Sequence, residues 1–310
     1  FTQIKFFSCA VFCIEKIKSV FLSVYLCRLC AIKTSASMKR KLILIALCCL
    51  CSFGLSAQDY NKLVEEAMAC AQQDSLVRAE QLFREALRLD PKNARNALLF
   101  SNLGTVLKRQ GKVEEAIEAY TMALNITPYA TAILLNRAAL YLEQGMEEKA
   151  YIDYCNVIDL IPEEKEARLF RAYIYMQRRQ YKEARIDYNV LLEKDMKNKS
   201  ARIGLVMLDQ KEGKYIAARD RLNLLVEEYP QDASLLKMRA NIELEQGFAD
   251  AALIDLEAAS ALEPEDADIY VMMGDIYLQQ KEKSKARQSY RRAIELGIPA
   301  VQLQEKLKQC

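Results

Sequence analysis

The feature that most constrains the fold is a residue skeleton that returns every 34 residues. Residues 111–128 read GKVEEAIEAYTMALNITP, and residues 145–162 read GMEEKAYIDYCNVIDLIP. Both segments open on Gly, place Ala fifth after it and Tyr four residues further on, and close on Pro. The same skeleton defines units at 60–93, 97–130, 131–164, 165–198, 199–232, 233–266 and 267–300. A fixed period of this length is typical of repeat architectures.

Each unit has the pattern of two antiparallel helices. The first half has helical periodicity and ends in most units at a Gly, which tolerates the left-handed backbone of a helix C-terminus. In the second half, an Ala and a large apolar residue four positions later share one face, and a Pro near the end stops the helix. One such pair cannot bury its own apolar face. We therefore expect an all-α, right-handed superhelical solenoid of about seven antiparallel helix pairs over 58–300, with a capping helix at 301–310.

Composition argues against catalysis. The chain has no His, so the commonest general base and transition-metal ligand is missing. Its glycines are single and lie at repeat turns, so they form no phosphate-binding loop. We expect no catalytic residue, no bound metal and no cofactor, and therefore no enzyme activity. Beyond residue 57 the chain holds 36 Lys and Arg against 41 Asp and Glu, which disfavours a nucleic-acid partner.

The segment 38–57, MKRKLILIALCCLCSFGLSA, has the order of a secretory signal peptide: basic residues, a short apolar core and small residues at a cleavage point. A membrane anchor and a lipoprotein signal are the alternatives. We interpret residues 1–37 as a spurious upstream extension of the reading frame, with a genuine amphipathic or membrane segment as the other reading. The predicted location is the periplasm after signal cleavage, with no remaining membrane span. Full secretion and a eukaryotic secretory lumen are the alternatives.

The motif small–x2–Tyr, Ala–x3–Tyr and Pro at this period resembles the tetratricopeptide repeat family. The resemblance covers 60–300. It departs from the family pattern in three ways: Trp is absent, Met196 stands where Pro is usual, and Arg179 and Lys281 replace the Gly of the turn. The family resemblance leads us to expect weaker turns at these positions.

In this family the first helix of each pair lines the concave side. The resemblance therefore implies a partner-binding groove, rich in large apolar residues and Met, which suit adaptable contacts. The alternative is that some of these side chains belong to the core. The groove residues implied are Leu98, Asn102, Leu135, Asn136, Leu169, Phe170, Tyr173, Met176, Ile203, Met207, Lys237, Met238, Asn241 and Met272.

We predict a non-catalytic scaffold that holds a peptide or helix of a partner protein in this groove. One alternative is a self-assembling, homo-oligomeric envelope component, and another is an accessory subunit of an envelope complex. Some co-chaperones of the family clamp a terminal carboxylate with Lys and Asn. Here Lys237 and Asn241 match that pattern, but Met272 stands where the next Asn is required, so we do not expect a clamp.

Overall fold

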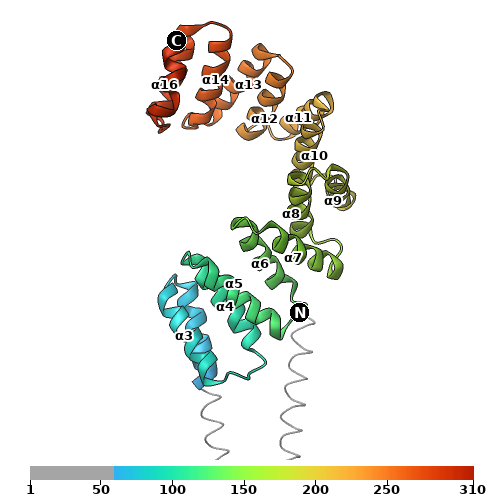
Figure 1. Cartoon of the computed structure of the whole chain (residues 1–310), viewed down its shortest axis with the longest axis vertical. Coiled ribbons are helices and arrows are strands. Elements are labelled where there is room, and N and C mark those ends of the chain that lie inside the picture. The colour runs from blue at the N-terminus through green and yellow to red at the C-terminus, as the bar shows by residue number, and fades with distance from the viewer. Residues whose placement is uncertain (1–58) are drawn as a thin grey trace, which may run out of the picture. The chain divides into compact units, whose positions relative to one another are not determined.

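The computed structural model describes residues 59–310, and all regular elements in this range are α-helices (Figure 1). The predicted signal peptide and the segment upstream of it lie outside the described residues. The chain divides into two compact units, one ending at Ile126 and one beginning at Thr127. The predicted all-α repeat fold is confirmed.

The first unit contains two helix pairs. Residues 59–72 are helical and are followed by α3 (Leu76–Leu89), α4 (Asn96–Arg109) and α5 (Val113–Ile126). Tyr120 of α5 lies buried against Gly104 of α4, where a Cβ atom would stand 2.8 Å from the tyrosine ring. A residue without a side chain therefore lets this ring approach the neighbouring backbone.

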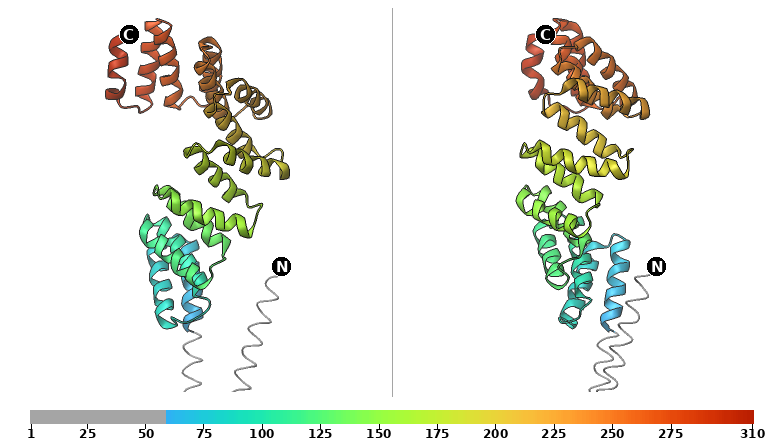
Figure 2. Two further views of the ribbon diagram at one scale, coloured as in Figure 1. Left: turned by 45° about the vertical axis from the view of Figure 1, so that its right-hand side comes forward. Right: turned by 90° about the vertical axis from the view of Figure 1, so that its right-hand side faces the viewer.

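The second unit continues the alternation of short helices, as Figure 2 shows for the green, yellow and red parts of the chain. Successive helices pack against each other along the chain. Their bounds are α6 Thr131–Glu143, α7 Glu147–Leu160, α8 Lys165–Gln177, α9 Tyr181–Lys194, α10 Lys199–Lys211, α11 Tyr215–Glu228, α12 Ala233–Glu245, α13 Ala249–Leu262, α14 Ala267–Gln279, α15 Lys283–Glu295 and α16 Ala300–Gln309.

The turns inside the pairs adopt left-handed backbone. Gly145 has a φ of 70° and Gly247 a φ of 82°, a region that Gly enters without steric strain. Arg179 and Lys281 occupy the same turns of their own pairs with φ values of 57° and 64°. Arg179 and Lys281, which replace the usual Gly, therefore keep the geometry of the turn. Their backbone is strained, because residues with a side chain disfavour the left-handed region.

In the described part of the chain, no helix has the length and apolar character needed to cross a bilayer. The same residues hold no group of three or more Cys, Asp or Glu side chains placed to bind a metal ion.

Candidate functional site

The residues predicted to line the groove fall into three exposure classes. Those on the surface are Leu98, Asn136, Phe170, Tyr173, Met207 and Asn241. Those half-buried are Asn102, Leu135, Leu169, Ile203, Lys237, Met238 and Met272. Met176 alone among them is buried. Leu98 and Asn102 belong to the first compact unit, and the others belong to the second.

Three exposed apolar side chains on α8 and α10 form what we call the α8–α10 face: Phe170, Tyr173 and Met207. Their exposed fractions are 38%, 42% and 37%. Phe170 and Tyr173 are three residues apart on α8, so they share one side of that helix. Tyr173 and Met207 hold the same position in consecutive repeats, and α8 packs against α10. The side chains are thus large, apolar and accessible on adjacent first helices.

Phe170 also covers a buried tyrosine. Its ring stacks on that of Tyr154 in α7, with centroids 5.6 Å apart and planes 13° from parallel. The hydroxyl of Tyr154 is buried and has no hydrogen-bond partner, and burial raises its pKa. The equivalent Tyr290 donates to Asp275 at 2.7 Å. Phe170 of the α8–α10 face therefore packs on a tyrosine whose hydroxyl has no hydrogen-bond partner.

Two predicted groove residues have other roles. Met176 is 9% exposed and packs in a core cluster, where its Sδ accepts a hydrogen bond of 3.4 Å from the Tyr188 hydroxyl. It is a core residue, and its placement in the groove was wrong. The ammonium of Lys237 forms an ion pair with Asp266, the N-cap of α14. Lys237 therefore ties one repeat to the next.

A recurring buried ion pair was not predicted from the sequence. In three repeats an Arg on the first helix bonds with two nitrogens to an Asp sixteen residues later on the second helix, and all six distances are 2.6–2.8 Å. The pairs are Arg137–Asp153, Arg171–Asp187 and Arg239–Asp255. The signal was present, because Arg and Asp recur at this spacing within the 34-residue period.

The repeat at 199–232 carries a different ionic cluster. Asp209 of α10 is buried and accepts from Arg185 of α9 at 2.6 Å and from Arg221 of α11 at 2.8 Å. Burial alone would raise the pKa of Asp209, but the hydrogen bonds from Arg185 and Arg221 outweigh it and lower that pKa. This carboxylate joins two consecutive repeats, a structural role.

Comparison with known proteins agrees with the geometry. A family model described as tetratricopeptide repeat matches residues 237–300, and one described as TPR repeat matches residues 104–145. A solved tetratricopeptide repeat protein from Parabacteroides merdae is 35% identical, with a TM-score of 0.70. The match covers 81% of this chain and 98% of that one. The chain belongs to the tetratricopeptide repeat family.

Two more distant structures share the fold alone. Pseudomonas aeruginosa pilF is 19% identical with a TM-score of 0.54, and the match covers 72% of this chain and 99% of that one. A chain of the APC/C hetero-tetramer Cut9-Hcn1 is 15% identical with a TM-score of 0.55, covering 76% of this chain and 52% of that one. No curated protein matches this chain.

Proposed function

We propose that this protein is a non-catalytic scaffold that binds a peptide or helix of a partner protein across its first helices. The observation that carries the proposal is the α8–α10 face, where Phe170, Tyr173 and Met207 are each more than a third exposed. Aromatic and Met side chains are enriched at protein interfaces because they offer large contact areas and adapt to their partners. Membership of the tetratricopeptide repeat family supports the same class of function.

The test is a pull-down from envelope extract with the full chain and with a variant carrying Phe170→Ser, Tyr173→Ser and Met207→Ser. We expect the parent to retain a partner that the variant loses while its helix content stays unchanged. The matched control carries Val77→Ser on α3 and Ile216→Ser and Leu224→Ser on α11, where the parent side chains are 60–66% exposed. Equal retention by all three proteins would remove the α8–α10 face from the binding surface.

A second candidate function is self-assembly, and a specific observation favours it. Ile152, Ile186 and Ile254 hold the same position on three second helices, and 51%, 61% and 67% of their surfaces are exposed. The repeat between Ile186 and Ile254 has the exposed Asp220 at this position, so the aliphatic positions are not continuous. Exposed aliphatic side chains are a surface that association would cover. The measurement is the dependence of solution mass on concentration. Self-assembly predicts a mass that rises with concentration in the parent. A variant with Ile152→Ser, Ile186→Ser and Ile254→Ser should stay monomeric.

We further propose that the protein is exported to the periplasm by residues 38–57 acting as a cleaved signal peptide. The support is the order of basic, apolar and small residues in that segment. Intact-mass analysis of the processed protein tests it. A mature chain that begins at Gln58 is the expected result, and a mature chain that retains Met38 would overturn it.

A further inference from the structure

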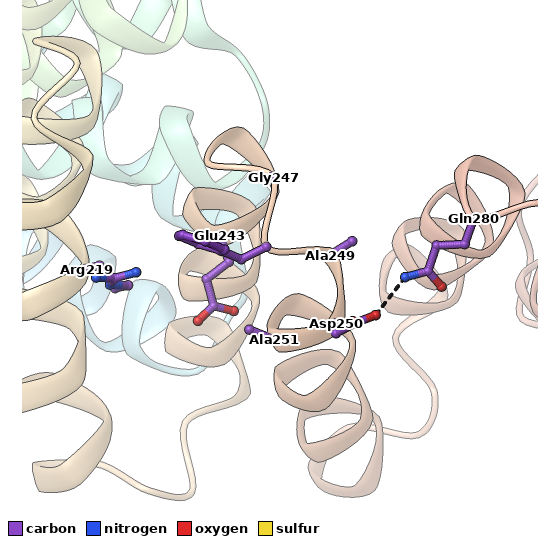
Figure 3. Close-up of a pocket in the computed structure, with 8 residues that line it drawn as sticks. Arg219, Glu243, Gly247, Ala249, Asp250, Ala251 and Gln280 are labelled. Carbon is purple, nitrogen blue, oxygen red and sulfur yellow. Dashed lines mark hydrogen bonds between the residues drawn. The ribbon is translucent and has the colours of Figure 1, made fainter.

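A pocket of about 460 Å³ lies where the turns of three repeats meet, between the start of α11, the end of α12, the start of α13 and the end of α14. Its lining includes Arg219, Glu243, Phe248, Asp250 and Gln280. Figure 3 shows the carboxylate of Glu243 extending into the space between Arg219 and Ala251. The pocket shares no residue with the α8–α10 face.

Glu243 is the unusual member of this pocket. It is 9% exposed, and its Oε2 is buried without a hydrogen-bond partner. Burial raises the pKa of Glu243, the nearby carboxylate of Asp255 raises it further, and Arg239 and Arg219 oppose the rise. A buried carboxylate oxygen without a donor is costly for the folded protein, and a donor that arrives from outside would remove that cost.

Asp209 is a carboxylate at the same position of the preceding repeat, and it has hydrogen-bond donors. Glu243 follows Asp209 by one period of 34 residues, so both hold the same repeat position. Asp209 receives Arg185 from the preceding second helix and Arg221 from its own. One period later, Arg219 stands where Arg185 stands, and Asp255 replaces Arg221. Glu243 thus has a carboxylate where Asp209 has a cation. Arg239, which stands where Leu205 stands, donates to that carboxylate of Asp255 through two hydrogen bonds of 2.6 Å.

Arg219 is directed elsewhere. Its guanidinium lies over the Phe248 ring, 5.7 Å from the centroid, and its Nη1 donates to Gln246 Oε1 at 3.3 Å. At the opposite rim, Gln280 Nε2 donates to Asp250 Oδ1 at 2.8 Å (Figure 3). Arg219 and Gln280 therefore donate to other acceptors, and neither donates to Glu243 Oε2. Phe248 is 50% exposed and offers a flat apolar surface at the rim.

We propose that this pocket binds an arginine side chain of a partner protein, whose guanidinium donates to Glu243 Oε2 beside the ring of Phe248. The guanidinium takes the part that Arg221 plays at Asp209. A planar fork can bond a carboxylate and lie against an aromatic ring at once, which a compact ammonium does less well. This second contact site is independent of the proposed binding across the first helices.

The test uses the full chain, labelled with ¹⁵N, and blocked arginine (Nα-acetyl-arginine-N-methylamide) as the probe. We expect saturable shifts of the Gly247, Phe248 and Ala249 amides with an affinity in the millimolar range. Blocked citrulline, the neutral isostere, should produce no saturable shift. Glu243→Gln should weaken arginine binding at least about fivefold, because it removes the charge and keeps the shape. Glu257→Gln, an exposed change on the neighbouring helix α13, should leave binding unchanged.

Arg219 separates this proposal from a simpler one, in which Arg219 itself pairs with Glu243 in solution. The proposal expects Arg219→Gln to bind the probe as tightly as the parent or more tightly, since a like charge is removed. It also expects a smaller drop in the urea midpoint than Arg185→Gln causes at Asp209. Equal drops for the two variants, equal binding by Glu243→Gln, or tighter binding of blocked lysine than of blocked arginine would each overturn the assignment.

Discussion

The guanidinium of Arg171 grips the carboxylate of Asp187 through two hydrogen bonds, each 2.8 Å long. Arg168 adds a third contact to the same carboxylate at 2.5 Å, and Asp187 is almost completely buried. Asp187→Ala removes the buried carboxylate to which both Arg168 and Arg171 donate. We expect it to reduce the free energy of unfolding by about 3–5 kcal/mol, measured by urea titration followed by circular dichroism.

The control for this variant is the surface pair of Lys194 and Glu163, whose side chains are both 59% exposed. Glu163→Ala should leave the urea midpoint unchanged, because water screens exposed ion pairs. A midpoint for Asp187→Ala equal to that of the control would show that the Arg171 pair is not a source of stability.

The two turns without Gly provide a stabilising prediction. Arg179 and Lys281 hold left-handed backbone that a side chain disfavours. Arg179→Gly and Lys281→Gly should each raise the free energy of unfolding by about 0.5–1 kcal/mol, seen as a higher urea midpoint. The reverse change, Gly145→Ala at a φ of 70°, should lower it by a similar amount. If Arg179→Gly and Gly145→Ala shift the midpoint in the same direction, the strain argument fails.

Gly204 lets two repeats approach closely. A Cβ atom there would lie 2.4 Å from the ring of Tyr188, closer than packed atoms tolerate. Gly204→Ala should therefore lower the free energy of unfolding by about 1–3 kcal/mol. In a double-mutant cycle, Tyr188→Leu should relieve the clash, so the double variant should lose less than the sum of the single losses. Strict additivity would mean that Gly204 and Tyr188 do not compete for space.

Two tyrosines at the same repeat position should respond oppositely to loss of the hydroxyl. Tyr154 has a buried hydroxyl without a partner, whereas Tyr290 donates to Asp275 at 2.7 Å. Tyr154→Phe should raise stability by about 1 kcal/mol, and Tyr290→Phe should lower it by about as much. Thermal and urea unfolding of the two variants beside the parent provide the check. A loss of stability in Tyr154→Phe would reveal a partner for its hydroxyl.

The raised pKa of Glu243 should be visible in how the stability of the protein depends on pH. Because its pKa is raised in the folded state, the folded protein binds the proton more tightly than the unfolded chain. This favourable contribution is present below the ordinary value of 4.5 and is lost as pH rises through the folded pKa. Glu243→Gln should therefore stabilise the protein at pH 7, with a gain that shrinks as pH falls toward 4.5.

Asp209→Asn is the matched opposite. The lowered pKa of Asp209 means that its carboxylate stabilises the fold above the ordinary value of 3.8. The substitution should destabilise at pH 7, and the difference from the parent should vanish as pH falls through the folded pKa. Urea midpoints measured across the acid range decide both cases, and equal pH profiles for the two variants would contradict the assigned environments.

The period of the sequence was sufficient to predict the helix pairs, because Ala, Tyr, Gly and Pro each mark a fixed place in the unit. It was insufficient for the site. Met176 has the spacing of a groove residue, but its flexible side chain turns into the core toward Tyr188. Whether Glu243 has a hydrogen-bond donor depends on the rotamer of Arg219. The spacing of residues in the sequence does not predict a rotamer. The Arg–Asp pairs were readable at a spacing of sixteen but lay outside the family motif.

The carboxylate of Asp209 is held from both neighbouring second helices, by Arg185 and by Arg221. The other buried Arg–Asp pairs fasten the two helices of a single repeat. When the repeat array unfolds from one end, a repeat of this kind can unfold without its neighbour. At Asp209, the hydrogen bonds from Arg185 and Arg221 link α9, α10 and α11, so these three helices should unfold together. Their amide hydrogens should therefore exchange as one cooperative block and not helix by helix.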